Sequence, residues 1–553
     1  MNLKALLFDT RSIQRYIFAG KKLRTNVGAS YLVERMFDDM LVGGGASQAA
    51  DGKPGVLQEM FGENLDRASW VENPDASISA PCTVGYIGGG KALIFLSGEE
   101  SSLEPLAKEI VYRFTRRLLT AMPGLSTGVA IEDYDATDFI GTQQRLFNRL
   151  KRNQQLFSAQ TEVPLSGLTR ICGLSGESAN YLDLRHEIDD PVQDDASHVF
   201  FSQGMAARAK AFKQAKKRWR QEFGKVLGDN VFPVELDKQL GQKLGENDIA
   251  VVHVDGNRMG LRFQGCASLG DYRRMAVGVR KHTKLAVERL VGDVCREYPT
   301  YDEHIAPFEN KDGHICVPIR PLILGGDDVT FVCNAKLALQ YTMRLIRYMS
   351  EPNEETKSLL PDGIDCCGGI AIFRTSYPFA RGVVLAEQAC DAAKKASRDK
   401  PGSSWLDFVL LHGEQAPELE EIRAREYQGA YIPELHFGPY CVGECENAGE
   451  HRAEYLVSAI REMMGAMEAD MIARNKVKEM RGILQKNLYE ITSYMEKLEH
   501  QKAVVPGGKG WQAYRKTLTC PDKNGQPWTP YVDVVEMMEY YVPIGEAGEN
   551  GDK

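Results

Sequence analysis

The chain has 553 residues, a length that predicts about two to four domains with sizeable hydrophobic cores. A hydrophobic content of 43% and a charged content of 26% are ordinary for a globular protein, and the net charge of −9 excludes a global basic field that would attract nucleic acid. No apolar run reaches membrane-spanning length and the 12 cysteines show no disulfide framework, so we expect a cytoplasmic protein with reduced thiols and no membrane partner.

Residues 1–138 are predicted to form a β-α-β-β-α-β unit, which is the ferredoxin-like pattern. The expected elements are a strand at 3–9, a helix-rich stretch at 12–41, a hairpin at 83–96, a helix at 101–121 and a strand at 126–132. The glycine- and acid-rich residues 42–80 are expected to be loop. The tip of the hairpin reads Gly88-Gly89-Gly90-Lys91.

Residues 139–245 are predicted to be a helical linker domain with helices at 139–160 and 203–227. The second helix is strongly basic, with Arg208, Lys210, Lys213, Lys216, Lys217, Arg218, Arg220 and Lys225. Because charge runs usually lie on solvated helix faces, we favour that interpretation over an RNA-contacting surface.

The order of elements in the first unit recurs in residues 246–415, which predicts an internal duplication. The expected elements are strand 248–255, helix 269–298, strands 317–324 and 328–333, helix 335–351, strand 367–373, helix 378–397 and strand 405–411. Aligning the two units places Asp9 on Asp255, Gly128 on Gly369, and the first hairpin tip on Gly325-Gly326-Asp327-Asp328. Residues 416–553 are predicted to form a helical domain with helices at 452–470 and 473–499 and a disordered tail.

The Gly-Gly-Asp-Asp tip carries two adjacent carboxylates between two β-rich runs. Gly325 and Gly326 tolerate positive φ and would let a phosphate approach the backbone without a Cβ in the way. Asp327 and Asp328 point to opposite sides of the departing strand and repel each other unless a cation lies among them. Oxygen ligands of this kind suit Mg²⁺ or Mn²⁺, although a polar hairpin tip is the simpler interpretation of these four residues alone.

Asp255 favours a metal site over a simple polar hairpin tip. It ends the apolar strand 248–255 and precedes the turn Gly256-Asn257-Arg258-Met259-Gly260. A carboxylate at a strand end beside an acidic hairpin is the palm arrangement of nucleotidyl cyclases and polymerases. Two metal ions in such a palm clamp the attacking hydroxyl and the leaving pyrophosphate. We therefore predict that Asp255 and Asp327 hold metal ions and act in catalysis, with Asp328 supporting them.

The chain resembles the large palm-domain polymerase/cyclase subunit of type III CRISPR effector complexes. The matching segments follow the order of that family over most of residues 1–415: Ile13-Gln14, Lys22-Leu23-Arg24, Gly28–Leu32, Gly88–Gly90, Asp255–Gly260, Gly325–Asp328 and Ala392–Lys395. The predicted fold class is therefore α+β, with two ferredoxin-like palm domains, a helical linker and a helical C-terminal domain. The resemblance implies a template-independent nucleotidyltransferase that uses ATP and Mg²⁺ or Mn²⁺ to make cyclic or linear oligonucleotide second messengers in antiviral defence. It also implies guide RNA, target RNA and other effector-complex subunits as partners.

Several nucleotide contacts follow from the resemblance. Those in the second palm are Gly256, Asn257, Gly325, Gly326 and Lys394, and those in the first palm are Ser30, Gly88, Gly89 and Lys91. Lys394 would neutralise phosphate charge, with a solvated lysine as the alternative. Lys91 stands where the second palm has an aspartate, so the first palm would hold a nucleotide without activating it, unless Lys91 is simply solvated.

Two features depart from the family. No His-Asp dipeptide occurs, so we do not expect the DNA-cutting activity of an HD domain, and Cys172 has no second cysteine nearby to form a zinc site. His436, Cys441, Cys445 and His451 have a zinc-like spacing, but we favour free thiols and surface histidines. Two other functions stay open, namely a standalone GGDEF-like cyclic dinucleotide synthase and a non-catalytic nucleotide-binding scaffold of an RNA-guided complex.

Overall fold

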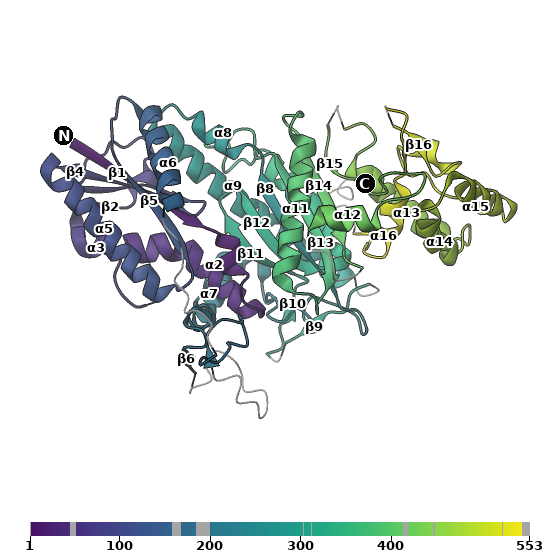
Figure 1. Cartoon of the computed structure of the whole chain (residues 1–553), viewed down its shortest axis with the longest axis horizontal. Coiled ribbons are helices and arrows are strands. Elements are labelled where there is room, and N and C mark those ends of the chain that lie inside the picture. The colour runs from purple at the N-terminus through teal and green to yellow at the C-terminus, as the bar shows by residue number, and fades with distance from the viewer. Residues whose placement is uncertain are drawn as a thin grey trace.

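The computed structural model describes residues 2–44, 51–156, 167–183, 200–301, 304–310, 312–412, 418–445, 448–522 and 524–544. Figure 1 shows the chain running along the long axis of the molecule, from β1 and β4 at one end to α14 and α15 at the other. Across these described ranges, no helix combines the length and apolarity that crossing a bilayer requires. All 12 cysteines are free thiols, as expected.

The first palm is a five-stranded sheet in the order β2-β3-β4-β1-β5. Its strands are β1 (Asn2–Arg11), β2 (Leu65–Asp66), β3 (Cys82–Gly88), β4 (Lys91–Gly98) and β5 (Ser126–Asp133). Its helices are α1 (Ile13–Ile17), α2 (Leu23–Arg35), the π-helical η1 (Met36–Val42), α3 (Val56–Phe61), η2 (Gly62–Asn64), α4 (Ser69–Glu72) and α5 (Glu100–Ala121). The expectation of loop at 42–80 was therefore partly wrong, because short helices and one strand form there.

Alternating residues of β1 face different helices. Phe8 packs edge-on against Phe114 of α5, with ring centroids 5.4 Å apart. Asp9 points the other way and accepts a 2.8 Å hydrogen bond from Nε2 of Gln154, on α6 (Phe139–Leu156) of the linker. The first-palm sheet thus lies between α5 and the linker helix.

The second palm is a six-stranded sheet in the order β11-β12-β8-β13-β14-β15. Its strands are β8 (Asp248–Gly256), β11 (Ile319–Gly325), β12 (Asp328–Asn334), β13 (Cys366–Arg374), β14 (Ser404–Leu410) and β15 (Tyr440–Val442). Its helices are α8 (Met259–Gln264), α9 (Leu269–Glu297), η4 (Tyr298–Thr300), η5 (Ala335–Leu337), α10 (Ala338–Ser350) and α11 (Phe379–Ser397), and a small hairpin adds β9 (Phe308–Glu309) and β10 (Ile315–Cys316). Helix α9 begins at a capping box of Ser268 and Asp271, which satisfies its first backbone N–H groups.

The strand registers confirm that the two hairpins are equivalent. Gly88 pairs with Lys91 in the first palm and Gly325 pairs with Asp328 in the second, and each hairpin has a register shift at the same place, next to Val84 and Pro321 respectively. Asp9 pairs with Lys91, while the ladder between β8 and β12 brings Asp255 next to Asp328.

One part of the predicted alignment was wrong by two residues. Asp9 lies opposite Gly128 and Asp255 lies opposite Cys367, so the counterpart of Gly128 is Cys367 and not Gly369. A shift of two residues keeps a side chain on the same face of a strand, so the apolar pattern alone does not reveal the error.

The linker joins the palms through α7 (Gln203–Leu227), which packs closely on α2; the predicted residues 157–160 of the other linker helix lie outside the described ranges. A Cβ on Gly28 would lie 1.8 Å from the backbone oxygen of Arg208, so only glycine fits there. Arg208 is buried over the Tyr16 ring, and Arg218 bonds to Glu34 at 2.6 Å. These two arginines are structural, whereas Lys213, Lys216 and Lys217 are exposed.

The C-terminal domain is helical, as predicted. It contains α12 (Leu419–Glu426), α13 (Ala453–Glu468), α14 (Arg474–Leu484), α15 (Leu488–His500), η6 (Gln512–Arg515) and α16 (Tyr531–Met538), with the short strands β16 (Cys520–Pro521) and β17 (Pro527–Trp528). The single helix predicted at 473–499 is two helices, because Asn487 caps the start of α15 through the backbone N–H of Glu490. The predicted tail, 546–553, lies outside the described residues. The α+β fold class is confirmed.

Candidate active site between the two palms

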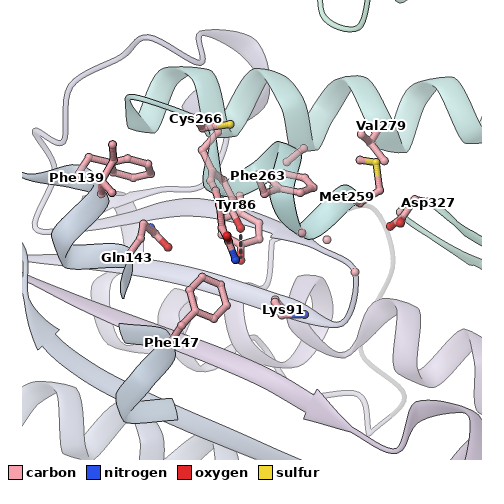
Figure 2. A pocket seen from close by; sticks show the side chains of 18 of the residues that line it. Tyr86, Lys91, Phe139, Gln143, Phe147, Met259, Phe263, Cys266, Val279 and Asp327 are labelled. Atoms are coloured by element: carbon pink, nitrogen blue, oxygen red, sulfur yellow. Dashed lines mark hydrogen bonds between the residues drawn. The ribbon is translucent and has the colours of Figure 1, made fainter. Parts of the chain in front are cut away.

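The hairpin tips of the two palms face each other. A Cβ built on Gly326, whose φ is +74°, would lie 3.7 Å from the backbone nitrogen of Gly89. Beside the tips is a cavity of about 880 Å³. Figure 2 shows that its walls come from the first palm, the linker helix α6 and the helices α8 and α9 of the second palm. The predicted site residues that line it are Gly88, Gly89, Lys91, Gly326 and Asp327.

Asp327 belongs to the acidic hairpin tip and lines the cavity. A Cβ on Gly256 would lie 2.9 Å from both Cβ and Oδ2 of Asp327, so a larger residue at 256 would displace this carboxylate. Burial, followed by the nearby charge of Asp255, raises the pKa of Asp327 above its ordinary value. Without a cation, the site therefore disfavours the ionised form of Asp327.

Asp328 faces His253 in the middle of the sheet. Its Oδ1 lies 3.3 Å from Nδ1 of His253 but has no hydrogen-bond partner, and Nδ1 is closer to Oγ1 of Thr330, at 3.1 Å. Burial and the charge of Asp255 raise the pKa of Asp328 to about 8, and burial lowers the pKa of His253. A neutral histidine beside this half-buried carboxyl group supplies little compensating charge.

Asp255, at the end of β8, forms an ion pair with Lys394 of α11. Burial alone would lower the pKa of Lys394, but the contact with Asp255 outweighs it and the pKa is raised. Glu387, also on α11, has its pKa raised to about 7 by burial. Asp255, Asp327 and Asp328 thus form one acidic cluster, with Lys394 bonded to Asp255.

The chemistry of this cluster fits a hard divalent cation. The donors are carboxylate oxygens, and the unpartnered Oδ1 of Asp328 and the raised pKa values of Asp327 and Asp328 are features that a bound cation would relieve. The three carboxylates are not arranged as ligands of one ion, since the described residues contain no group of three or more His, Cys, Asp or Glu side chains positioned to hold a metal.

Two predicted nucleotide contacts make structural hydrogen bonds. The Ser30 hydroxyl is buried and donates to the carbonyl oxygen of Leu322 on β11, so Ser30 joins the two palms. The backbone N–H of Asn257 donates to the carbonyl oxygen of Asp365 at 2.7 Å, and its side chain donates to that of Ser403 at 3.2 Å. Gly325 and Lys394 lie beside the acidic cluster and do not line the cavity.

The first palm has no acidic cluster at the matching position. Nζ of Lys91 lies 3.3 Å from Oδ1 of Asp9, and Gln154 donates to Oδ2 of the same carboxylate. Lys91 therefore neutralises the charge of Asp9, and the Gln154 amide donates a hydrogen bond to it. Asp9 is the residue of the first palm that corresponds to Asp255.

One wall of the cavity, which α6 supplies, was not predicted from the sequence. Phe139, Gln143 and Phe147 line it, together with Phe263 of α8 and with Tyr86. The first three residues are spaced by four, so they lie on one face of a helix. That spacing is the signal that could have found them, although nothing in it indicates which part of the chain the face contacts.

The zinc-like spacing in the C-terminal region does not form a metal site. His436 is buried between two acids, with Nε2 2.6 Å from Asp407 and Nδ1 3.1 Å from Asp533. Nδ1 of His451 donates to the carbonyl oxygen of Phe437 at 2.9 Å. Cys441 and Cys445 form no disulfide, and the expectation of surface histidines was wrong, since His436 is buried and His451 is half-buried.

Comparisons with known proteins support the palm fold. Residues 248–401 match the family model described as Cas10/Cmr2, second palm domain. The chain is similar in fold to a chain of the crystal structure of the Csm1-Csm4 cassette in complex with pppApApA, with 13% identity, a TM-score of 0.51, and coverage of 98% of this chain and 70% of that chain. The chain is a Cas10-like palm-domain protein.

Two further solved structures resemble this Cas10-like chain, each with coverage of 98% of it and 70% of the other chain. Csm1 in T.onnurineus has 14% identity and a TM-score of 0.51, and the apo Csm1-Csm4 cassette has 15% identity and a TM-score of 0.50. At these identities the likeness shows the fold alone. A search of curated protein sequences finds no match to the chain.

Proposed function

We propose that this Cas10-like chain is a metal-dependent nucleotidyltransferase. It would join nucleotides from ATP, without a template, into cyclic or linear second messengers for antiviral defence. The observation that carries the proposal is the acidic cluster of Asp255, Asp327 and Asp328, in which Asp327 lines the cavity beside the two facing hairpin tips. Three clustered acids, of which Asp327 and Asp328 have raised pKa values and Asp328 has an unpartnered oxygen, destabilise the protein without a ligand, and such residues concentrate at functional sites.

Each residue of the site would have its own role in binding the metal ions or the nucleotide. Asp255 and Asp327 would hold Mg²⁺ or Mn²⁺, and Asp328 would support them from the His253 side. When bound, such ions neutralise the triphosphate and make the attacking hydroxyl more acidic. Lys394 would leave Asp255 and pair with phosphate oxygens, while Gly256 and Gly326 leave room for Asp327 and for the nucleotide.

The first palm would hold a second nucleotide without activating it. Lys91 lines the cavity and is about one third exposed, so it is available to pair with a triphosphate. Both hairpin tips belong to one chain, whereas a standalone GGDEF-like synthase must bring two chains together to pair two nucleotides. The single-chain arrangement supports the Cas10-like reaction over that alternative.

ATP is the proposed substrate because the Csm1-Csm4 cassette, which contains a chain of similar fold, has a crystal structure in complex with the adenylate trimer pppApApA. Because Csm1 forms that cassette with Csm4, we propose by the same likeness that the chain works with other effector-complex subunits. The motifs that resemble those of type III CRISPR effector subunits extend the proposal to guide RNA and target RNA. We expect RNA or a partner subunit to bind at the exposed Lys213, Lys216 and Lys217 of α7.

The test is to incubate the purified protein with labelled nucleoside triphosphates and Mg²⁺, with and without candidate RNA. We expect pyrophosphate release and oligonucleotide products from ATP, abolished by a metal chelator. Reversing the charge of Lys213, Lys216 and Lys217 should weaken the response to RNA but preserve nucleotide binding. Nucleotide binding without any product under all conditions would favour the non-catalytic scaffold.

A further inference from the structure

Gln143 is a buried amide with no partner. Its side chain is 8% exposed, it lines the cavity between the palms, and neither Oε1 nor Nε2 has a hydrogen-bond partner. Burying a donor and an acceptor without partners costs free energy, so native proteins rarely do so without a purpose. Figure 2 shows the amide within the cavity, near Phe139 and Tyr86. The amide thus offers one donor and one acceptor to whatever enters.

The walls around Gln143 are aromatic. Phe139 and Phe147 lie about one turn before and after it on the same face of α6, and Phe263 of α8 projects from the other side of the cavity (Figure 2). Phe147 is 37% exposed, which leaves part of its ring uncovered. Flat apolar rings around a donor–acceptor pair suit a planar heterocycle, which can stack on the rings and hydrogen-bond at its edge.

The other end of the cavity carries charge. Lys91 and Asp327 line it near the hairpin tips, while Gln143 and the aromatic residues line the part next to α6. A ligand with a planar base at one end and phosphates at the other matches this division. The volume of about 880 Å³ is ample for one nucleotide.

We propose that Gln143 reads the base of the nucleotide and selects adenine over guanine. This inference rests on the proposed function, since it assumes that the cavity holds the nucleotide substrate. Oε1 would accept a hydrogen bond from the N6 amine and Nε2 would donate to N7, which is the bidentate pairing that glutamine makes with adenine. Guanine offers two acceptors, O6 and N7, at the same edge, so Oε1 would stay unpartnered.

The experiment compares binding of non-hydrolysable ATP and GTP analogues to the full chain by calorimetry. The wild type should prefer the ATP analogue by about 10-fold or more, the discrimination expected for one bidentate contact. Gln143→Met keeps the shape of the side chain but removes both polar atoms, so it should abolish the preference by weakening ATP-analogue binding. Gln144→Leu, a change at the exposed neighbour on the cavity rim, is the matched control and should keep the preference.

Thermal unfolding without nucleotide separates base reading from a structural role. Because the unliganded amide is unpartnered, Gln143→Met should unfold at the same temperature as the wild type or higher. A lower unfolding temperature with equal loss of both analogues would overturn the inference, as would an unchanged preference in Gln143→Met. An ATP preference that depends on Gln143 in a protein that releases no pyrophosphate would refute only the proposed reaction. Failure of the wild type to bind either analogue would refute both.

Discussion

In the first palm, Asp9 at the end of β1 is neutralised by Lys91 and receives a hydrogen bond from Gln154. In the second palm, the matching Asp255 has two more carboxylates beside it, and Asp328 takes the position of Lys91. The backbones share the order of four strands (β3-β4-β1-β5 and β11-β12-β8-β13), the hairpin pairing and the register shift, so the difference at the tips lies in the charges. One palm satisfies its acidic residue within the protein, whereas the other keeps an excess of acid that a divalent cation would balance.

The largest expected effect comes from removing one acid of the second palm. Asp327→Asn should fold normally but reduce pyrophosphate release from ATP by about 100-fold or more, because positioned charge contributes most of the stabilisation in phosphoryl transfer. Asp9→Asn makes the same chemical change in the first palm and should alter turnover less than about 3-fold. Equal turnover by wild type and Asp327→Asn, or an equal loss in both variants, would contradict the assigned difference between the palms.

A smaller effect is expected from the lysine of the first palm. Lys91→Met should weaken binding of an ATP analogue by about 3- to 10-fold, since one partly exposed charge pair with phosphate contributes about 1 kcal/mol. Stability should change little, because the ion pair with Asp9 is itself partly exposed. Lys108→Met, which removes an exposed lysine of α5 in the same palm, should leave the affinity unchanged. Unchanged affinity in Lys91→Met would mean that this lysine is only solvated.

The pH dependence of stability should come from the second palm. The pKa of Asp328 is raised to about 8, above its ordinary value, so its contribution to stability is present at about pH 4 and is lost as the pH rises through about 8. Without metal, the wild type should therefore unfold at a lower temperature at pH 9 than at pH 6, and Asp328→Asn should reduce that difference. Mg²⁺ should raise the unfolding temperature more at pH 9, because binding requires ionised carboxylates. A pH profile that Asp328→Asn leaves unaltered would refute this origin.

The smallest effect concerns the contact that holds the palms together. Ser30→Ala removes the hydrogen bond to the carbonyl of Leu322 and should lower the free energy of unfolding by about 1 kcal/mol. The affinity for an ATP analogue should stay within a factor of about two, since Ser30 does not line the cavity. Denaturant unfolding and calorimetry on the same variant measure both quantities. A tenfold loss of affinity at unchanged stability would return Ser30 to the nucleotide contacts.

The parts of the fold and site that follow from local patterns could be predicted. Strand periodicity and turn residues within short stretches predict the hairpins, the carboxylate at the end of β8 and the duplication. Asp255, Asp327 and Asp328 come together because neighbouring strands of one palm carry them.

The parts that depend on packing between distant segments could not be predicted. Ser30 contacts Leu322 from another domain, and α6 reaches the cavity from the linker. The sequence of α6 contains the face of Phe139, Gln143 and Phe147, but not its neighbours. The break between α14 and α15 was missed because both helices have apolar residues at helical spacing on either side of it.

The most direct test of the difference between the palms is a crystal structure with Mn²⁺ and a non-hydrolysable ATP analogue, in which anomalous scattering locates the metal. We expect manganese at Asp255 and Asp327, none at Asp9, and one nucleotide at each palm, one of them with its triphosphate next to Lys91. Manganese at Asp9, or nucleotides paired only between the second palms of two chains, would contradict the account.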